Sequence, residues 1–400
     1  MRSTRYEILY TTFDQVPGPK GAATHVEAFV RALGAGQGHV TLVTPGARDQ
    51  SRPSLFPNVD HVVLGCPDLN PIGRARTFRA KLVAWLGEKR FDVIHFRSIF
   101  EGFPFLNPEV RRQARLIYEV NGLPSIELKY HYPRIASDTA LLSKLERQEN
   151  ACLRAAERII TVSDVNASYL RQRGVAPEKI HVIRNGVHRD EFPYRPRESV
   201  TREHGHSESL QVAYVGTMAS WQGIETLLAA VAMARRQRSI TLHLMVTGPK
   251  QRQREIQQRV EQLQLSDTVV LHAPGSRADV ARLYHQVDLS AVPLEAVDRN
   301  LLQGCCPLKL LESMAAGCPV LASDLPVVNE VAKASVHYCA VTAGDVSAWA
   351  EALVQWDTNL HRERWGDVAT MTCNAHQIIA AQFTWQQATD SLLQLYRLAD

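Results

Sequence analysis

One short stretch of the sequence, residues 301–323 (LLQGCCPLKLLESMAAGCPVLAS), places an acid and a lysine inside an apolar run. Glu312 follows Lys309 by three residues, and its nearest neighbours in the helical pattern are apolar: Leu310, Leu311 and Met314. A solvated helix glutamate fits such neighbours poorly. Lys309 lies at the N-terminal side of the same predicted helix, where the helix dipole favours phosphate. The stretch therefore predicts a ligand site at the start of a helix.

A second candidate for chemistry is the glycine-bearing segment PGPKGAATHV, residues 17–26. It follows the first predicted strand and precedes a predicted helix, which is the context of a loop that faces a phosphate or a substrate. Gly18 and Gly21 alone are a weak signal, because any strand-to-helix turn can use glycine.

The composition is that of a globular protein, with 45% hydrophobic and 22% charged residues in 400. The sequence contains no uninterrupted run of about 18 apolar residues, so we expect no membrane-spanning helix. The N-terminus lacks the apolar region of a signal peptide. We expect a cytoplasmic protein. The seven cysteines have no paired C-x2-C spacing, and the fifteen histidines form no H-E-x-x-H motif. Reduced thiols and no metal are predicted.

Charge is distributed unevenly along the chain. Up to Arg195 there are 28 Lys and Arg against 20 Asp and Glu, a net charge of +8, and beyond it 17 against 21, a net charge of −4. Much of the excess lies in residues 74–90, RARTFRAKLVAWLGEKR. Two interpretations stay open: a surface helix with its apolar stripe in the core, or a helix that adsorbs peripherally to the anionic inner membrane surface. The basic residues are too dispersed for nucleic acid.

Short β-rich runs alternate with amphipathic helical runs, which predicts an α/β fold with parallel sheets. Two such series flank a polar segment, residues 193–209, that has no apolar period and is interpreted as a linker. At 400 residues, two domains are expected. We place the first domain at residues 1–195, the second at 196–375, and a terminal helix that packs back on the first domain at 376–400.

Three segments in this order carry a family resemblance: RIITVSDVNASYLRQRGVAPEKIHVIRNGVHRDEF, VAYVGTMASWQGIETLLAA and PLKLLESMAAGCPVLAS. Together they resemble the family-4 retaining glycosyltransferases. The resemblance implies the GT-B fold, two Rossmann-like domains facing each other across a cleft. It also implies a nucleotide-sugar donor, a glycan, lipid-linked or small-molecule acceptor, and no metal or other cofactor.

For the donor, the resemblance implies that the two oxygens of Glu312 accept hydrogen bonds from the ribose hydroxyls. In the family a second glutamate usually touches the donor sugar, and here Gly304 replaces it. The resemblance therefore does not indicate which sugar is transferred. The family's arginine and lysine at the diphosphate are replaced by Thr217, in Gly216-Thr217-Met218, and by Gln222, in Gln222-Gly223. Lys309 is the proposed substitute cation. The expected donor-binding set is Glu312, Gly216, Thr217, Gln222, Leu308, Leu310, Gly304, Cys305 and Cys306, with His272 in a base-binding loop.

In the first domain, Asn121 stands where many family members have a histidine beside the reacting sugar. We therefore predict Lys309, Asn121 and Glu119 as the catalytic residues. The expected phosphate or acceptor loop residues are Lys20, Gly21, Ala22, Arg97 and Arg184. His25 and His95 are further candidates, although a place in the core or in a loop explains these histidines better. Glu127 has two open interpretations, acceptor binding or a structural role.

Replacement of the family's glutamate, arginine, lysine and histidine by Gly304, Thr217, Gln222 and Asn121 leaves a second hypothesis open. In it, the chain is a catalytically weak GT-B protein that binds a nucleotide or a partner. Retention of Glu312, Lys309 and the VIRNGV segment places it second. A GT-B epimerase or phosphorylase shares the architecture but not this order of motifs.

Overall fold

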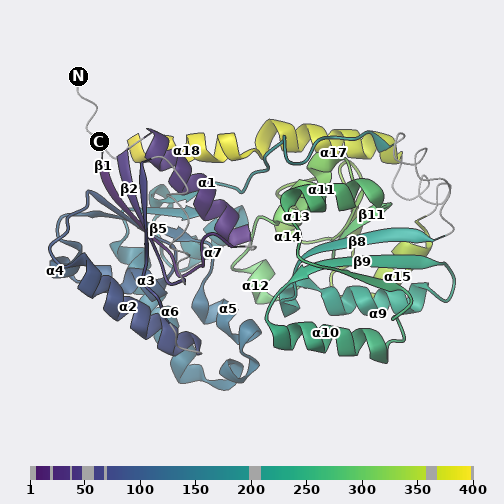
Figure 1. Cartoon of the computed structure of the whole chain (residues 1–400), viewed down its shortest axis with the longest axis horizontal. Helices are drawn as coiled ribbons and strands as arrows, with labels where there is room; N and C mark the ends of the chain where they lie inside the picture. The colour runs from purple at the N-terminus through teal and green to yellow at the C-terminus, as the bar shows by residue number, and fades with distance from the viewer. Residues whose placement is uncertain are drawn as a thin grey trace. The chain divides into compact units, whose positions relative to one another are not determined.

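The structure is a computed structural model that describes residues 6–18, 21–36, 38–46, 58–66, 70–197, 209–356 and 367–397. It consists of two compact units. The first comprises Met1–Arg184 and Ala388–Asp400, and the second comprises Asn185–Gln387. The chain is drawn in Figure 1, with labels on its α-helices and on some of its strands.

The first unit contains a seven-stranded sheet whose strand pairs are all parallel, in the order β3-β2-β1-β4-β5-β6-β7. The strand order reverses at β1, which pairs with both β2 and β4. The strands are β1 (Tyr6–Thr11), β2 (Gly38–Thr44), β3 (Val59–Val63), β4 (Val93–Phe96), β5 (Arg115–Val120), β6 (Arg158–Thr161) and β7 (Ile180–Val182).

Helices cover both faces of this sheet, with α1 on one face and α2 on the other (Figure 1). One of its hydrophobic clusters joins Phe78 and Leu82 of α2 to Leu145 of α6 and to the strands. The helices are α1 (Gly21–Gly36), α2 (Pro71–Leu86), α3 (Ile99–Gly102), α4 (Pro108–Arg111), α5 (Pro124–His131), α6 (Thr139–Ala155), α7 (Asp164–Gln172) and α18 (Trp385–Arg397), with short 3-10 turns η1 (Phe103–Leu106), η2 (Pro133–Ser137) and η3 (Pro177–Lys179).

The second unit repeats the pattern with a six-stranded sheet, again parallel throughout, in the order β10-β9-β8-β11-β12-β13. Here the order reverses between β8 and β11, because β8 pairs with both β9 and β11. The strands are β8 (Leu210–Thr217), β9 (Ile240–Thr247), β10 (Val269–His272), β11 (Leu289–Val292), β12 (Val320–Ser323) and β13 (Cys339–Val341).

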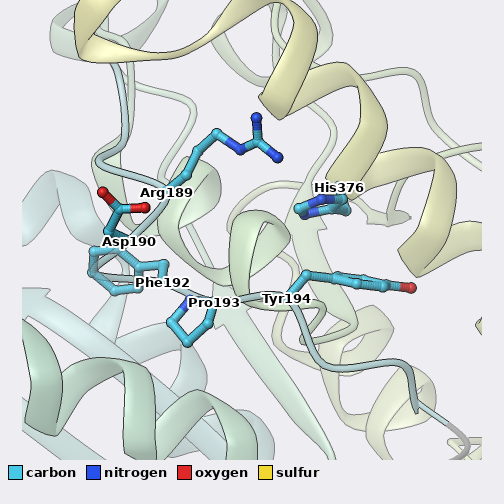
Figure 2. A pocket seen from close by; sticks show the side chains of 6 residues that line it. All are labelled: Arg189, Asp190, Phe192, Pro193, Tyr194 and His376. Atoms are coloured by element: carbon cyan, nitrogen blue, oxygen red, sulfur yellow. The ribbon is translucent and has the colours of Figure 1, made fainter.

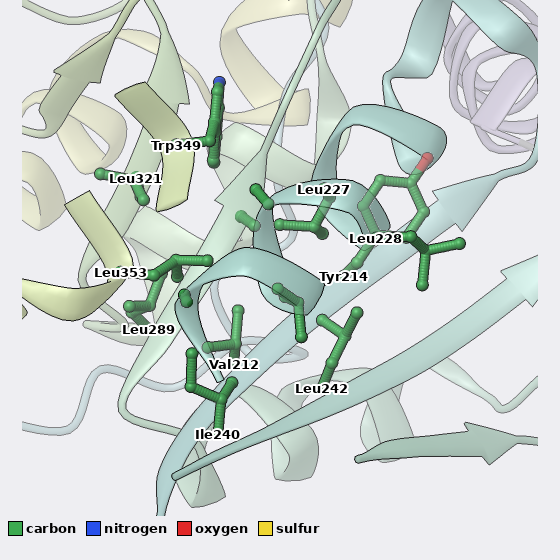
Figure 3. Close-up of a cluster of buried hydrophobic side chains, with 14 of the residues drawn as sticks. Val212, Tyr214, Leu227, Leu228, Ile240, Leu242, Leu289, Leu321, Trp349 and Leu353 are labelled. Atoms are coloured by element: carbon green, nitrogen blue, oxygen red, sulfur yellow. The ribbon is translucent and has the colours of Figure 1, made fainter. Parts of the chain in front are cut away.

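The core of the second unit packs β8 and β9 against α9 and α15, with Trp349 completely buried (Figure 3). Apolar residues of α9 recur at helical spacing, for example Ile224, Leu227, Leu228 and Val231, which explains this packing. The helices are α9 (Ile224–Ala234), α10 (Lys250–Gln262), α11 (Arg277–Gln286), α12 (Asp298–Leu301), α13 (Leu308–Ala316), α14 (Pro326–Asn329), α15 (Val346–Val354) and α17 (Val368–Gln382), with the 3-10 turn η4 (Ser220–Gln222).

The predicted α/β class with two parallel, Rossmann-like sheets is confirmed. The division of the chain falls after Arg184 and after Gln387, whereas the sequence pattern suggested residues 195 and 375. Contacts of the connecting segment explain the earlier division. Asn185 Nδ2 donates to Cys306 O at 2.8 Å, and Arg197 pairs with Asp288 at 3.0 Å, so this segment belongs to the second unit.

Candidate functional site

The carboxyl ends of β8 and β11 meet where the strand order of the second sheet reverses. Ligands of open parallel α/β sheets bind at such positions. β8 ends in Gly216 and Thr217, and α13 carries Lys309 and Glu312. The structure brings Gly216 and Lys309 together, because a Cβ built on Gly216 would lie 3.0 Å from Lys309 Nζ.

Helix α13 positions the lysine and the acid. It begins after Pro307, which provides no side-chain cap, and ends at Gly317 in the left-handed conformation, with a φ of 79°. Three apolar residues anchor it in the core: Leu310, Leu311 and Met314. Lys309 is the second residue of the helix, so its side chain starts beside the positive end of the helix dipole.

Lys309 is 8% exposed, and its Nζ has no hydrogen-bond partner among the described residues. The ammonium lies 3.8 Å from the centre of the Tyr214 ring. Burial lowers the pKa of Lys309 to about 7, and Cys305 and Glu312 offset the effect only in part. A buried cation without an acceptor is unfavourable, and an anionic ligand would relieve this.

Glu312 lies one helical turn beyond Lys309 and is half-buried. Within the described residues, no hydrogen bond to its carboxylate is found, although Arg277 and Glu191 act on it electrostatically. Arg277 itself pairs with Glu191, at 2.6 Å. Burial raises the pKa of Glu312 to about 7, and Glu191 adds to the rise. Both oxygens thus remain available to a ligand.

The turn at the end of β8, residues 216–218, is called the β8 turn below, and two side chains hold it. Tyr214 donates its hydroxyl hydrogen to Thr217 O at 2.7 Å. Arg252 of α10 donates from Nε to Met218 O at 2.8 Å, and it pairs with Glu225 and Glu255. Arg252 was not predicted, because it comes from α10, the next helix but one along the chain.

Gln222 is half-buried in η4, and Gly223 follows it with a φ of 73°. A Cβ on Gly223 would lie 1.5 Å from Pro293 O, so only glycine permits η4 to lie against the end of β11. Gln222, which was predicted to bind the donor, therefore lies on a turn whose conformation depends on Gly223.

The loop before α13 has a buried cation of its own. Gly304, with a φ of 68°, accepts a hydrogen bond from Arg299 Nη1 to its carbonyl at 2.6 Å. Cys305 is half-buried, and burial raises the pKa of its thiol. Leu310 is completely buried, so this predicted donor contact is a core side chain, whereas Leu308 is half-buried. Arg299 was not predicted.

His272 is at the end of β10, the edge strand, which lies two strands or about 10 Å from β8. Its Nε2 lies 2.9 Å from Nδ1 of His243, which in turn contacts Gln211 at 2.8 Å. The structure therefore separates His272 from the group formed by Lys309, Tyr214 and the β8 turn.

In the first unit, Glu119 near the end of β5 is the centre of a buried polar cluster. Its carboxylate contacts five side chains: Tyr10 (2.5 Å), His25 (3.0 Å), His95 (3.1 Å), Arg97 (2.8 Å) and Asn121 (2.5 Å). Burial alone would raise the pKa of Glu119, but the neighbouring His25 and Arg97 outweigh it and hold this pKa well below its ordinary value. Glu119 is thus an ionised anchor for its neighbours.

Asn121 stands directly after β5 and is half-buried, with its Nδ2 bonded to Glu119. Its Oδ1 has no hydrogen-bond partner within the described part of the chain. His95 of β4 connects the cluster to the C-terminal helix, since its Nδ1 lies 2.8 Å from the Tyr396 hydroxyl. Burial lowers the pKa of His95, so a neutral imidazole is favoured.

The predicted loop residues of this unit differ in their surroundings. Arg97 is buried and pairs with Glu119 and, at 2.5 Å, with Asp14 of the β1–α1 loop. Gly21 and Ala22 begin α1, whereas Lys20 lies outside the described residues. Arg184 pairs with Asp164 at the start of α7.

Glu101 explains how Arg97 is held. Its carboxylate accepts the backbone N–H groups of Arg97 at 3.0 Å and Ser98 at 2.7 Å, completing a capping box for α3. Burial raises the pKa of Glu101 to about 8. This buried acid was not predicted, because its role depends on a helix of only four residues.

A pocket of about 290 Å³ lies elsewhere in the second unit. Figure 2 shows the side chains that line it: Arg189, Asp190, Phe192, Pro193, Tyr194 and His376. The rings of Tyr194 and His376 have centroids 4.2 Å apart. None of the predicted site residues lines this pocket.

Two further findings concern the described residues as a whole. They contain no group of three or more His, Cys, Asp or Glu side chains that could hold a metal ion. Among their helices, none is long and apolar enough to cross a membrane.

Two Rossmann-like units in one chain, each with a parallel sheet, define the GT-B fold. Solved structures agree. The chain resembles a sucrose-phosphate synthase from Thermosynechococcus elongatus with a TM-score of 0.79 and 21% identity over 98% of this chain and 99% of that one. It resembles HepE of Anabaena in complex with UDP-glucose with a TM-score of 0.73 and 18% identity, covering 98% and 100%. At these identities the likeness establishes the fold alone.

Sequence comparison gives the family. Residues 209–359 match the family described as glycosyl transferases group 1, and residues 19–191 match Glycosyltransferase Family 4. The chain therefore belongs to the family-4 glycosyltransferases. A D-inositol 3-phosphate glycosyltransferase of Mycobacterium marinum is 28% identical over 246 residues, which are 61% of this chain and 50% of that protein. The chain thus spans about half the length of the curated relatives that it matches first.

Proposed function

We propose that this protein is a metal-independent retaining glycosyltransferase that moves a hexose or related sugar from a nucleoside diphosphate donor to a glycan, a lipid-linked acceptor or a small molecule. The observation that carries the proposal is the buried, unpartnered ammonium of Lys309 beside the β8 turn. The named relative supports the small-molecule class, since it acts on an inositol phosphate. HepE supports the donor class, because it binds UDP-glucose.

In the proposed donor complex, Lys309 and the first turn of α13 bind the diphosphate. Charge-assisted hydrogen bonds of this kind are about twice as strong as neutral ones. Glu312, one turn on, accepts both hydroxyls of the ribose. In the free protein, burial favours the protonated form of the Glu312 carboxyl. In the complex, hydrogen bonds from the two ribose hydroxyls would favour the carboxylate.

For the chemical step, we assign the proton of the acceptor hydroxyl to the departing diphosphate, on the face from which it leaves. The bond from the anomeric carbon to the diphosphate oxygen breaks, and a bond to the acceptor oxygen forms on the same face. The protein then supplies positioning and charge stabilisation of an oxocarbenium-like transition state. Lys309 stabilises the leaving charge, and Asn121 Oδ1 is available to a sugar hydroxyl.

Glu119 was predicted to be a catalytic residue, but in this proposal it does not touch the substrate. Because it is completely buried, it positions Asn121 and Arg97. Replacement of Glu119 would therefore disturb the first unit as a whole.

The experiment is turnover of a panel of UDP-, GDP-, ADP- and TDP-sugars, with the anomeric configuration of the product followed by NMR. We expect transfer with retention from one donor class, and its loss in Glu312→Ala and Lys309→Ala with the fold intact. An inverted product would contradict the mechanism. Nucleotide binding without any turnover would favour the second candidate, a catalytically weak GT-B protein, which the replacement of the family's glutamate, arginine and lysine by Gly304, Thr217 and Gln222 also supports.

We also propose peripheral contact of helix α2 with the anionic inner membrane surface in the cytoplasm. Phe78 and Leu82 fill the core, and Arg79 donates to the backbone of α3, so part of the segment is structural. Ile72 and Val83 are 44% and 38% exposed on the outer side. Sedimentation with phosphatidylserine vesicles tests this, and binding that Val83→Asp leaves unchanged would contradict it.

A further inference from the structure

Tyr214 contacts both parts of the candidate donor site. The side chain is completely buried in the core of the second unit. Its ring lies 3.8 Å from Lys309 Nζ, and its hydroxyl donates to Thr217 O at 2.7 Å. One side chain thus connects the ammonium on α13 with the turn at the end of β8.

The ring is the favourable contact that holds the ammonium. Lys309 Nζ has no hydrogen-bond acceptor among the residues that the structure describes. Glu312 and Cys305 act on it only electrostatically, and Arg252 is the further charged group that acts on Tyr214. A cation over an aromatic face is stabilised most strongly where water is excluded. The ring therefore compensates part of the desolvation of Lys309.

The hydroxyl fixes the turn that the ammonium faces. Gly216 has a φ of 149°, and a Cβ there would lie 3.0 Å from both Cε and Nζ of Lys309. The lysine head is thus packed directly against the backbone of Gly216. A hydrogen bond to Thr217 O, one residue later, keeps this backbone in place.

We propose that Tyr214 is a positioning residue for the diphosphate, which aligns the Lys309 ammonium through its ring and the Gly216–Thr217 backbone through its hydroxyl. This inference rests on the proposed function, since it specifies how the same site recognises its donor. It implies two separable contributions. Tyr214→Phe removes only the hydroxyl, and Tyr214→Leu removes both contacts.

The test is calorimetric binding of the nucleoside diphosphate that binds best among UDP, GDP, ADP and TDP, of its monophosphate, and of inorganic pyrophosphate. For Tyr214→Phe we expect about fivefold weaker binding of the diphosphate and pyrophosphate, the effect of one hydrogen bond. For Tyr214→Leu we expect about 30-fold weaker binding or more, as the cation contact is lost too. Binding of the monophosphate should change less than about threefold.

The pH dependence provides a readout that a merely structural role would not move. The ring stabilises the charged lysine, so its removal in Tyr214→Leu should lower the pKa of Lys309. The pH above which diphosphate binding is lost should then fall. The matched control is Tyr338→Phe, which also removes a buried tyrosine hydroxyl, bonded to Asn329 Oδ1 at 2.6 Å, in the same unit. It should lower stability to a similar extent and leave the binding unchanged.

Diphosphate binding unchanged in both Tyr214 variants would overturn the inference, as would an equal loss of diphosphate and monophosphate. If Tyr214→Leu does not fold, Tyr214→Phe decides the question. If the wild-type protein binds none of the nucleotides but binds pyrophosphate, the proposed donor is wrong while the pyrophosphate series still tests Tyr214. Absence of all binding contradicts both.

Discussion

At the scale of single residues, two ionisable groups of α13 are held away from their preferred charge states. Burial lowers the pKa of Lys309 and raises that of Glu312, so that both lie at about 7. Each group is therefore unfavourable for folding over a definite pH range. A ligand that pairs with them would remove the penalty, which is typical of a binding site rather than a structural ion pair.

Replacing Lys309 by Met should stabilise the protein in a pH-dependent way. The folded state binds fewer protons than the unfolded state between pH 7 and 10.5, so wild-type stability rises with pH over this window. Lys309→Met lacks this dependence. We expect it to be more stable than wild type by up to about 3 kcal/mol at pH 7, with a smaller difference at pH 9. Thermal unfolding at both pH values measures this, and a constant difference would contradict it.

Replacing Glu312 by Gln should have the opposite pH dependence. The folded state binds more protons than the unfolded state between pH 4.5 and 7, so this side chain lowers wild-type stability as pH rises through that window. Glu312→Gln should therefore gain about 1–2 kcal/mol relative to wild type at pH 8 and little at pH 5. Nucleotide affinity should fall about tenfold or more. A variant that binds as wild type would exclude the ribose role.

Sequence spacing predicted some residues of the site and could not predict others. Lys309 and Glu312 are three residues apart on one helix, so their proximity follows from helix geometry. Arg252 reaches Met218 across 34 residues, and Asn185 reaches Cys306 across 121, so only the fold reveals these contacts. Leu310 was predicted to bind the donor, but its side chain faces the core because helical periodicity places it there.

At the scale of elements, the turns that end the strands limit what the sequence can tolerate. Gly223 joins η4 to α9 in the left-handed conformation, and it packs against the carbonyl of Pro293 after β11. The turn that carries Gln222 therefore depends on the neighbouring strand. Sequence alone shows a glycine before a helix, but not the close approach that requires it.

The variant Gly223→Ala should be strongly destabilised because its Cβ would lie 1.5 Å from Pro293 O. Gly174→Ala is the matched control, since Gly174 has a φ of 83° and no atom within 4 Å of its Cβ position. We expect a cost of about 1 kcal/mol for the control and at least about 2 kcal/mol more for Gly223→Ala. Calorimetry should show a decrease in Tm several degrees larger for Gly223→Ala. Equal decreases would contradict the steric explanation.

Elements with a clear apolar period were predicted closely, and others were not. The helix predicted around Lys309 and Glu312 is α13, Leu308–Ala316. Helix α17, Val368–Gln382, was not delimited, because it contains no Lys, Arg, Asp or Glu to mark a solvent face. Its buried residues form a narrow stripe of Met371, Thr372, Ala375 and Ile379.

At the scale of the whole molecule, the path of the chain makes the first unit depend on its last residues. This unit resumes at Ala388, within α18. Tyr396 of α18 is buried and contacts His95, which in turn contacts Glu119. The C-terminal helix therefore belongs to the polar cluster at the end of β4 and β5.

Tyr396→Phe should weaken the first unit selectively, because His95 Nδ1 would lose its partner inside the core. We expect a loss of about 1–2 kcal/mol and faster hydrogen exchange in β1 and β4, with β8 and β9 unchanged. Gln394→Ala, at an exposed position of the same helix, is the control and should change neither unit. Equal acceleration in both units would show that they do not unfold independently.

The central claim is that a nucleoside diphosphate binds in the second unit at the end of β8, against Lys309. Calorimetric titration of UDP, GDP, ADP and TDP into wild-type protein and Lys309→Met tests it most directly. We predict binding of at least one nucleotide to the wild type, weakened about 10- to 100-fold in Lys309→Met by the loss of a charged hydrogen bond. Binding of none of the four to the wild type, or equal affinity in the variant, would contradict the claim.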